Sequence, residues 1–224
     1  MRVSESREPQ LRGSGETWLS AAYQSLVESG VDAVRIGPLA KKVKLSRTSF
    51  YWFFRDRDTL LSVLLERWRT KNTGNLIRQT QAYAETITEG IFNVFDCWLD
   101  SRLFDSGLEF AVRSWAQQSE EVAGEIRDAD AARITALTDM FVRFGFKSHV
   151  ADVRARTTYL SQIGYISMKT TEEFSARMSR IPEYVEIFTG AVPLQRELER
   201  FFARHGYVTR KASAALASGR RKSR

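Results

Sequence analysis

Residues 34–61 constrain the fold most, because they encode two short helices separated by a tight turn. In the first helix, apolar residues recur three, one and three positions apart and therefore share one face, while Pro38 suits the first turn. Ser46 is a good N-cap for the second helix, which is predicted over residues 47–53. The residues expected to face inward are Ile36, Leu39, Ala40, Val43, Phe50, Phe53 and Phe54. This pair of helices is therefore expected to pack on one side and to expose the other.

The exposed side of the second helix carries side chains that could contact nucleic acid. They are Arg47, Thr48, Ser49, Tyr51 and Trp52. Such side chains can donate hydrogen bonds to phosphates and base edges, and a single helix is slim enough to enter a major groove. Tyr51 and Trp52 could instead be core aromatics, and Arg47 could be an ordinary solvated charge.

Positive charge is concentrated in two segments of this 224-residue chain, whose formal net charge is +7. Residues 35–57 hold seven Lys or Arg and one acid, Asp56, which is a net charge of +6. Residues 204–224 hold seven basic residues and no acid, whereas residues 1–34 and 58–203 are mildly acidic. A basic pair of helices on an acidic body indicates one docking face for nucleic acid, with a membrane surface as the weaker alternative.

The segment GPLAKKVKLSRTSFYWFFRDRDTLL, residues 37–61, resembles the DNA-binding signature of the TetR family of tetracycline-repressor-like regulators. The likeness includes Leu39 and Ala40 before the turn, the aromatic run 51–53, and the charged turn 55–58 before an apolar pair. The preceding residues resemble the first helix of that family and its glycine stop at Gly30, so that the likeness covers roughly residues 12–72. A weaker likeness, at residues 111–116, Gly145 and residues 156–164, is to the all-helical second domain of one branch of the family.

The resemblance implies an all-α protein with a three-helix N-terminal helix-turn-helix domain and a larger helical domain for ligand binding and dimerisation. It divides the chain into a flexible arm at 1–11, a DNA-binding domain at 12–72, an effector-binding and dimerisation domain at 73–205, and a basic, disordered tail at 206–224. It also implies a homodimer that responds to an effector and represses transcription from a palindromic double-stranded DNA operator. The same basic patches would suit a non-specific, nucleoid-type DNA-binding protein or a membrane-surface protein.

The sequence departs from the family pattern at two positions in this region. Lys44 stands where the turn usually has glycine, and a left-handed backbone there would cost on the order of 1–2 kcal/mol. Arg35 stands where the family often has a small hydroxyl residue, although arginine can reach the same phosphate. Arg57 resembles a phosphate-clamping position at a helix start, and Thr17 has a similar, weaker resemblance. The predicted DNA contacts are therefore Thr17, Arg35, Lys44, Arg47, Thr48, Ser49, Tyr51, Trp52 and Arg57.

Helical periodicity continues through the rest of the chain, where glycine and proline are sparse and strand patterns are absent. The pattern predicts helices at about residues 14–29, 37–43, 47–53, 57–80, 84–101, 107–117, 119–145, 149–168, 172–178 and 184–204. The helix that begins near Arg57 is expected to join the DNA-binding domain to the second domain.

Two groups of residues in the second domain are candidates for binding a ligand or a second copy of the chain. The predicted pocket for a small apolar effector is lined by Phe92, Phe95, Trp98, Phe110, Trp115, Phe141 and Tyr159. These aromatics could equally be plain core, because neighbouring helices fill most such stripes. The predicted dimer interface contains Leu160, Ile163, Gly164 and Ser167, all of which could instead pack within one chain.

Other function classes find little support in the sequence. Only two histidines are present, and no GxSxG, HExxH, phosphate-cradling glycine loop or paired-cysteine spacing occurs, so that neither an enzyme, a cofactor nor a metal site is expected. The single cysteine, Cys97, is expected to be a packed thiol. No segment resembles a signal peptide or a membrane span, which makes the cytoplasm the expected location. The arginines of the N-terminal arm could reach a minor groove, and the basic tail could attract phosphate or simply aid solubility.

Overall fold

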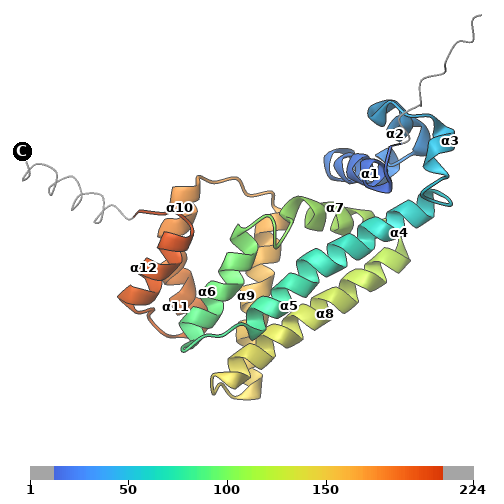
Figure 1. The fold of residues 1–224 in the computed structure, drawn as a ribbon. Helices are drawn as coiled ribbons and strands as arrows, with labels where there is room; N and C mark the ends of the chain where they lie inside the picture. The colour runs from blue at the N-terminus through green and yellow to red at the C-terminus, as the bar shows by residue number, and fades with distance from the viewer. Residues whose placement is uncertain (1–12, 209–224) are drawn as a thin grey trace, which may run out of the picture. The chain divides into compact units, whose positions relative to one another are not determined.

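The computed structural model describes residues 13–208, which form helices and turns without any strand (Figure 1). The all-α prediction is thus confirmed. The predicted N-terminal arm and nearly all of the predicted tail lie outside the described residues. Within residues 13–208, no helix combines the length and the apolar character needed to cross a membrane.

The described chain forms two compact units, and the division differs from the predicted one. Residues up to Asn72 together with Asp105–Asp128 make the first unit, and Thr73–Phe104 together with the residues from Ala129 onward make the second. The sequence instead predicts Asp105–Asp128 within the second domain, at residues 73–205. The chain passes between the units three times.

The first unit contains five complete α-helices and a short 3-10 helix. They are α1 (Gly15–Ser29), η1 (Val31–Ala33), α2 (Ile36–Val43), α3 (Arg47–Phe50), α4 (Arg57–Trp68) and α7 (Ser106–Ala116), followed by the start of α8 (Glu120–Arg143). Ser14 caps α1 by accepting from the Thr17 amide, and Gly30 ends the helix with φ of 81°. Trp18, Leu26 and Phe50 are fully buried, and the Trp18 and Phe50 rings meet edge to face with centroids 5.3 Å apart. This aromatic contact fixes α3 against α1.

A buried carboxylate joins α7 to α4 in the first unit. Glu109 has no exposed surface and accepts from Trp68 Nε1 at 2.6 Å, from Asn72 Nδ2 at 2.9 Å and from Arg113 Nε at 2.9 Å. Asp105, one turn earlier, accepts from the Tyr23 hydroxyl of α1 at 2.6 Å. These hydrogen bonds explain why α7 belongs with the N-terminal helices.

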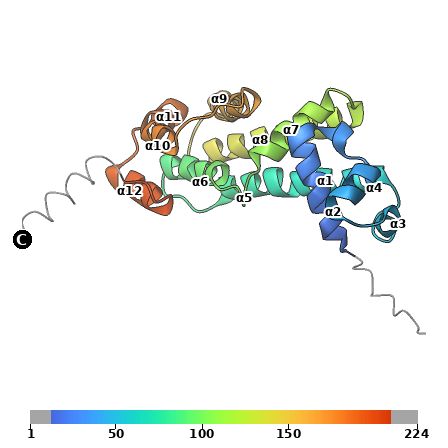
Figure 2. The ribbon, with the colours of Figure 1, turned by 90° about the horizontal axis from the view of Figure 1, so that it is seen from above.

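The second unit contains the remaining helices, with α6 at its centre. They are α5 (Asn75–Gln81), α6 (Ile87–Leu99), the later part of α8, α9 (Ser148–Ser167), α10 (Phe174–Ser179), α11 (Ile181–Thr189) and α12 (Gln195–Arg204). Figure 2 shows α6 beside α11 and α12, where Phe92 stacks on Phe201 with centroids 4.6 Å apart. Arg133 of α8 is fully buried and donates to the Tyr159 hydroxyl and to Thr73 Oγ1, each at 2.9 Å.

Two predicted long helices are interrupted, and one short helix is shorter than predicted. The predicted helix 57–80 consists of α4, a π-helical turn η2 (Arg69–Gly74) and α5. The predicted helix 184–204 is wrong as a single element, because Gly190 ends α11 with φ of 73° and Pro193 stands before α12. The predicted helix 47–53 ends at Phe50, and residues 51–53 form a turn.

Candidate nucleic-acid interface

The turn between α2 and α3 closes in the way that its sequence indicates. Ser46 caps α3, and its Oγ accepts from the Ser49 amide at 3.2 Å. Lys44 has φ of 56° and ψ of 39°, which is the left-handed conformation. The Leu45 amide donates to the Ala40 carbonyl at 3.0 Å and the Lys44 amide donates to the Lys41 carbonyl at 3.2 Å. This pattern is a Schellman motif, which normally favours glycine at the position of Lys44.

Lys44→Gly is therefore expected to raise the free energy of unfolding by about 0.5–1 kcal/mol, as measured by urea unfolding. Relief of roughly 1–2 kcal/mol of left-handed strain exceeds the roughly 0.4–1 kcal/mol of added chain entropy in the unfolded state. The matched variant Lys41→Gly changes a lysine with helical backbone in α2 and should lower stability by about 1 kcal/mol. A loss of stability in Lys44→Gly would contradict the strain argument.

Aromatic side chains at the end of α3 are open to solvent. Tyr51 is 59% exposed, Trp52 is 66% exposed and Phe53 is 41% exposed, whereas Phe50 and Phe54 are buried. The alternative that Tyr51 and Trp52 belong to the core is therefore wrong. The prediction that Phe53 anchors the core is also wrong, because α3 ends at Phe50 and the following turn directs residue 53 outward beside Gly15.

Among the polar residues of α3, Arg47 depends for its position on Gly37 of α2. Arg47 and Thr48 are exposed, and Ser49 Oγ donates to the Ser46 carbonyl at 2.8 Å. The Arg47 guanidinium lies against Gly37 of α2, with Nη2 2.8 Å from where a β-carbon on that glycine would stand. Gly37 therefore keeps open the space that Arg47 occupies at the front of α3, a role that the sequence did not reveal.

Three predicted phosphate contacts already make hydrogen bonds within the chain. Arg57 donates from Nε to the Val34 carbonyl at 2.6 Å and from Nη2 to the Val31 carbonyl at 2.8 Å. Arg35 Nε donates to the Asp32 carbonyl at 2.8 Å, and the Thr17 hydroxyl accepts from the Ser14 amide at 3.2 Å. Arg57 and Thr17 thus hold local structure together, which the sequence patterns did not indicate, and direct DNA contact by these residues stays a prediction.

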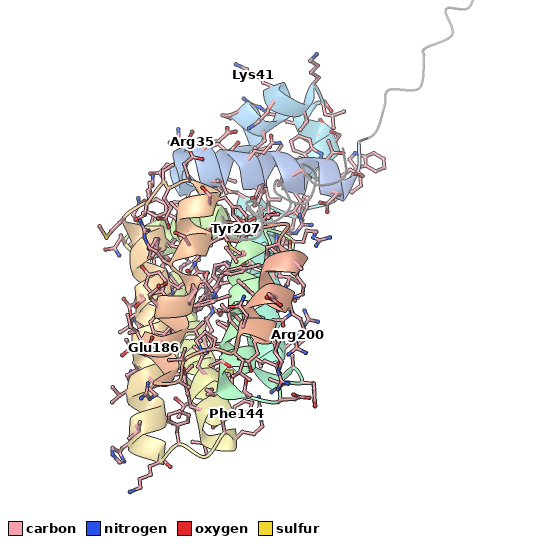
Figure 3. The ribbon with its side chains drawn as sticks, turned by 90° about the vertical axis from the view of Figure 1, so that its left-hand side faces the viewer. Arg35, Lys41, Phe144, Glu186, Arg200 and Tyr207 are labelled. Atoms are coloured by element: carbon pink, nitrogen blue, oxygen red, sulfur yellow. The ribbon has the colours of Figure 1, made fainter. Side chains whose placement is uncertain are left out.

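Basic side chains surround the exposed aromatics. Arg35 and Lys41 project outward from the first unit (Figure 3), and Lys44, Arg47 and Arg55 are also exposed. Asp56 is the acid among them, and it caps α4 by accepting from the Thr59 amide at 2.8 Å. That hydrogen bond and the one from Arg55 lower the pKa of the Asp56 carboxyl to about 2. The carboxylate is thus held by the helix start and by Arg55, and the surface around it remains basic.

Residues 19–64, which contain this α2–turn–α3 surface, match the family model described as bacterial regulatory proteins, tetR family. The N-terminal region of the chain is thus a TetR-type helix-turn-helix domain. A curated relative, the uncharacterized HTH-type transcriptional regulator YdeS of Bacillus subtilis strain 168, is 28% identical over 89 residues. The match covers 38% of this chain and 45% of the relative, so that the chain spans less than half the length of that protein.

Solved structures share the fold of this chain over most of its length. GusR of Salmonella enterica matches with a TM-score of 0.59 and 15% identity, over 84% of this chain and 99% of that one. The reduced form of Escherichia coli NemR matches with a TM-score of 0.54 and 17% identity, over 80% of this chain and 99% of that one. A putative TetR-family regulator of Mesorhizobium loti matches with a TM-score of 0.53 and 14% identity, over 88% of this chain and 98% of that one. At these identities the likeness shows the fold alone.

The second unit contains a cavity between α6, α9, α10 and α11, and two of the seven predicted pocket residues line it. Those two are Phe95 and Trp98. Phe92 lines a separate groove, whereas Phe141 packs on Phe146 and the Tyr159 hydroxyl is bonded to Arg133 and Asp130. The other two, Phe110 and Trp115, lie on α7 in the first unit. The lining residues that the sequence did not indicate are Leu99, Thr158, Ser161, Gln162, Tyr165, Arg177, Tyr184 and Phe188.

The predicted dimer residues lie on the outer face of α9. Leu160 is 57% exposed, Ser167 is exposed, and Ile163 and Gly164 are half-buried. Val153 is also exposed and precedes Leu160 by seven residues, as Leu160 precedes Ser167, so that these three share one helix face. No side chain lies within 4 Å of where a β-carbon on Gly164 would stand. Ile187 adds an exposed apolar side chain on α11.

Proposed function

We propose that this protein is a sequence-specific, DNA-binding transcriptional regulator that acts as a homodimeric repressor on a palindromic operator and responds to a small effector. The single observation that carries this proposal is the exposed pair Tyr51 and Trp52 at the end of a helix whose Phe50 is fully buried. The buried Phe50 anchors the helix, so that the two aromatic side chains stay exposed. Such side chains, surrounded by arginines and lysines, are suited to contact the edge of a DNA groove and its phosphates.

The homodimer follows from how little one short helix can read. A single recognition helix contacts only a few base pairs, whereas two copies related by a two-fold axis contact half-sites about 34–36 Å apart. The exposed apolar residues of α9 and α11 give such a pair a surface for association, because a charged or polar helix face would not bury apolar area. The palindromic operator is the expected consequence of that two-fold symmetry.

Selection from a pool of random duplexes tests the sequence-specific part of the proposal. The full chain should enrich one short, roughly palindromic sequence, and it should prefer that sequence over random duplex by about a thousandfold or more at physiological salt. Equal affinity for all sequences would contradict the proposal and favour a non-specific, nucleoid-type protein. Binding to anionic vesicles without any selected duplex would favour a membrane-surface protein. A reporter gene behind the selected operator should be silenced by the chain, and activation would contradict repression.

Leu160→Glu is expected to convert the dimer to a monomer, as measured by light scattering after size-exclusion chromatography. Two glutamates brought together on a two-fold axis would have to lose water beside like charges, which strongly disfavours association. Val142→Glu places the same charge at an exposed apolar position on α8 and should leave the dimer unchanged. A dimer that survives Leu160→Glu would show that this face of α9 is not the interface.

A further inference from the structure

The cavity in the second unit is lined by aromatic and hydroxyl-bearing side chains around a single cation. Phe95, Trp98 and Phe188 supply rings, while Tyr165 and Tyr184 join their hydroxyls at 2.8 Å. The charged residue among the lining side chains is Arg177 of α10, and no carboxylate lines the cavity. An apolar pocket with a few converging polar groups is the usual form of a small-molecule site.

Two of the lining side chains carry buried polar atoms without a hydrogen-bond partner among the described residues. Trp98 is 6% exposed and Thr158 is fully buried. Trp98 Nε1 and Thr158 Oγ1 both remain unbonded, although both side chains line the cavity. A buried indole N–H can only donate, and leaving it unbonded costs on the order of 1–3 kcal/mol. An acceptor atom from a ligand would remove that cost.

Arg177 adds a positive charge that no acid neutralises within residues 13–208. Its Nη2 donates to Gln162 Oε1 at 3.3 Å, which is a long hydrogen bond, and its guanidinium lies 5.7 Å from the centre of the Tyr165 ring. The next arginine, Arg180, is instead paired with Glu172. Arginine in an apolar setting is the side chain best suited to bind a carboxylate, because it can offer two parallel donors.

We propose that the cavity between α6, α9, α10 and α11 binds a small carboxylate that carries a planar aromatic ring. The carboxylate accepts from Arg177 and Trp98, and the ring packs among Phe95, Phe188 and the tyrosines. The absence of a lining acid argues against a cationic ligand, and the unbonded donors argue against a purely apolar one. This inference narrows the effector of the proposed function from an apolar molecule to an anionic aromatic one, and it rests on that function for its regulatory meaning.

The size of the cavity restricts the ligand and requires some movement. The space measures about 430 Å³ when its open mouth is included, whereas its interior is about 40 Å³. The interior alone holds only a few water molecules, so that a single-ring ligand enters when a lining side chain moves aside. Arg177 is able to move because its side-chain hydrogen bond to Gln162 is long and its helix, α10, has only six residues.

Isothermal titration of the full chain without DNA tests this site, with benzoate, benzamide and benzylamine as single-ring probes of similar size and different charge. Benzoate should bind at one molecule per chain with a Kd of roughly 1 mM or lower, and the neutral and cationic probes should bind at least about tenfold more weakly. Arg177→Gln should weaken benzoate binding at least about tenfold, and Trp98→Phe, which keeps a ring and removes the donor, should weaken it by roughly threefold to tenfold.

Arg127→Gln is the matched control, because it removes an exposed arginine of α8 in the first unit, and it should leave benzoate binding unchanged. Circular dichroism of each variant establishes that it is folded. Any one of three results would overturn the proposal. The first is equal affinity for the three probes, and the second is no detectable binding of benzoate at roughly 10 mM. The third is unchanged benzoate affinity in a folded Arg177→Gln variant.

A separate titration of the selected operator keeps this proposal distinct from the proposed function. Benzoate binding that leaves operator affinity unchanged would support the carboxylate site and contradict effector-responsive regulation. Loss of the carboxylate site with intact operator recognition would leave the DNA-binding proposal standing.

Discussion

Tyr51→Ala is expected to weaken binding to the selected operator by about 1–3 kcal/mol, which is roughly fivefold to 150-fold, while thermal unfolding and the dimer stay unchanged. The side chain is 59% exposed, and its aromatic contact within the chain is an edge-to-face approach to Phe50 at 5.3 Å. Removal of this exposed ring should therefore cost the folded chain little packing energy, whereas the complex with DNA should lose a complete side-chain contact. Fluorescence anisotropy with labelled operator measures the affinity, and calorimetry measures the unfolding.

Tyr83→Ala is the matched control for that variant. Tyr83 precedes α6 in the second unit and is 84% exposed, so that it loses the same atoms from a surface with no proposed role in DNA binding. It should leave operator affinity within the error of the wild-type value. A drop in thermal stability of several degrees in Tyr51→Ala would show that the ring packs against the first unit and does not read DNA.

Glu109→Ala should lower the free energy of unfolding by about 3–5 kcal/mol, because it leaves buried donors without their acceptor. The carboxylate accepts from Trp68, Asn72 and Arg113, and the Arg113 guanidinium would lose its buried negative partner. Urea unfolding monitored by circular dichroism measures the change. This variant should cause the largest loss of stability among the carboxylates of the first unit.

Glu120→Ala provides the comparison on a neighbouring helix. Glu120 is exposed at the start of α8 and pairs with exposed Arg127 at 2.8 Å, an interaction that contributes about 0–1 kcal/mol. Glu120→Ala should therefore lower the free energy of unfolding only slightly. If Glu109→Ala cost no more than Glu120→Ala, the buried network would not be what holds α7 to α4.

Local signals in the sequence predicted local structure well. The cap at Ser46 and the breaks at Gly30 and Lys44 depend on a few neighbouring residues, and the helices begin and end close to them. The exposure of Tyr51 and Trp52 also followed from the sequence, because Phe50 and Phe54 already supply the buried face. The family signature lies in the same segment.

The errors come from contacts between residues distant in sequence. The spacing of Phe53 predicts a core position, although the end of α3 at Phe50 turns this side chain outward. The aromatic character of Phe110 and Trp115 predicts a place in the effector pocket, although Glu109 binds their helix to Trp68 in the first unit. Arg177 was not predicted as a pocket residue, because its position depends on how α10 folds back beside α9. Periodicity alone cannot show such long-range arrangements.

The uneven burial of the five tryptophans gives this protein a built-in optical reporter. Trp18, Trp68 and Trp98 are buried, whereas Trp52 is the strongly exposed one within the described residues and lies on the proposed DNA surface. Soluble iodide should consequently quench the red-shifted emission of Trp52. A DNA duplex bound to that surface should shield Trp52 from the iodide. Label-free fluorescence can then follow the first unit, while the indole of Trp98 follows the second.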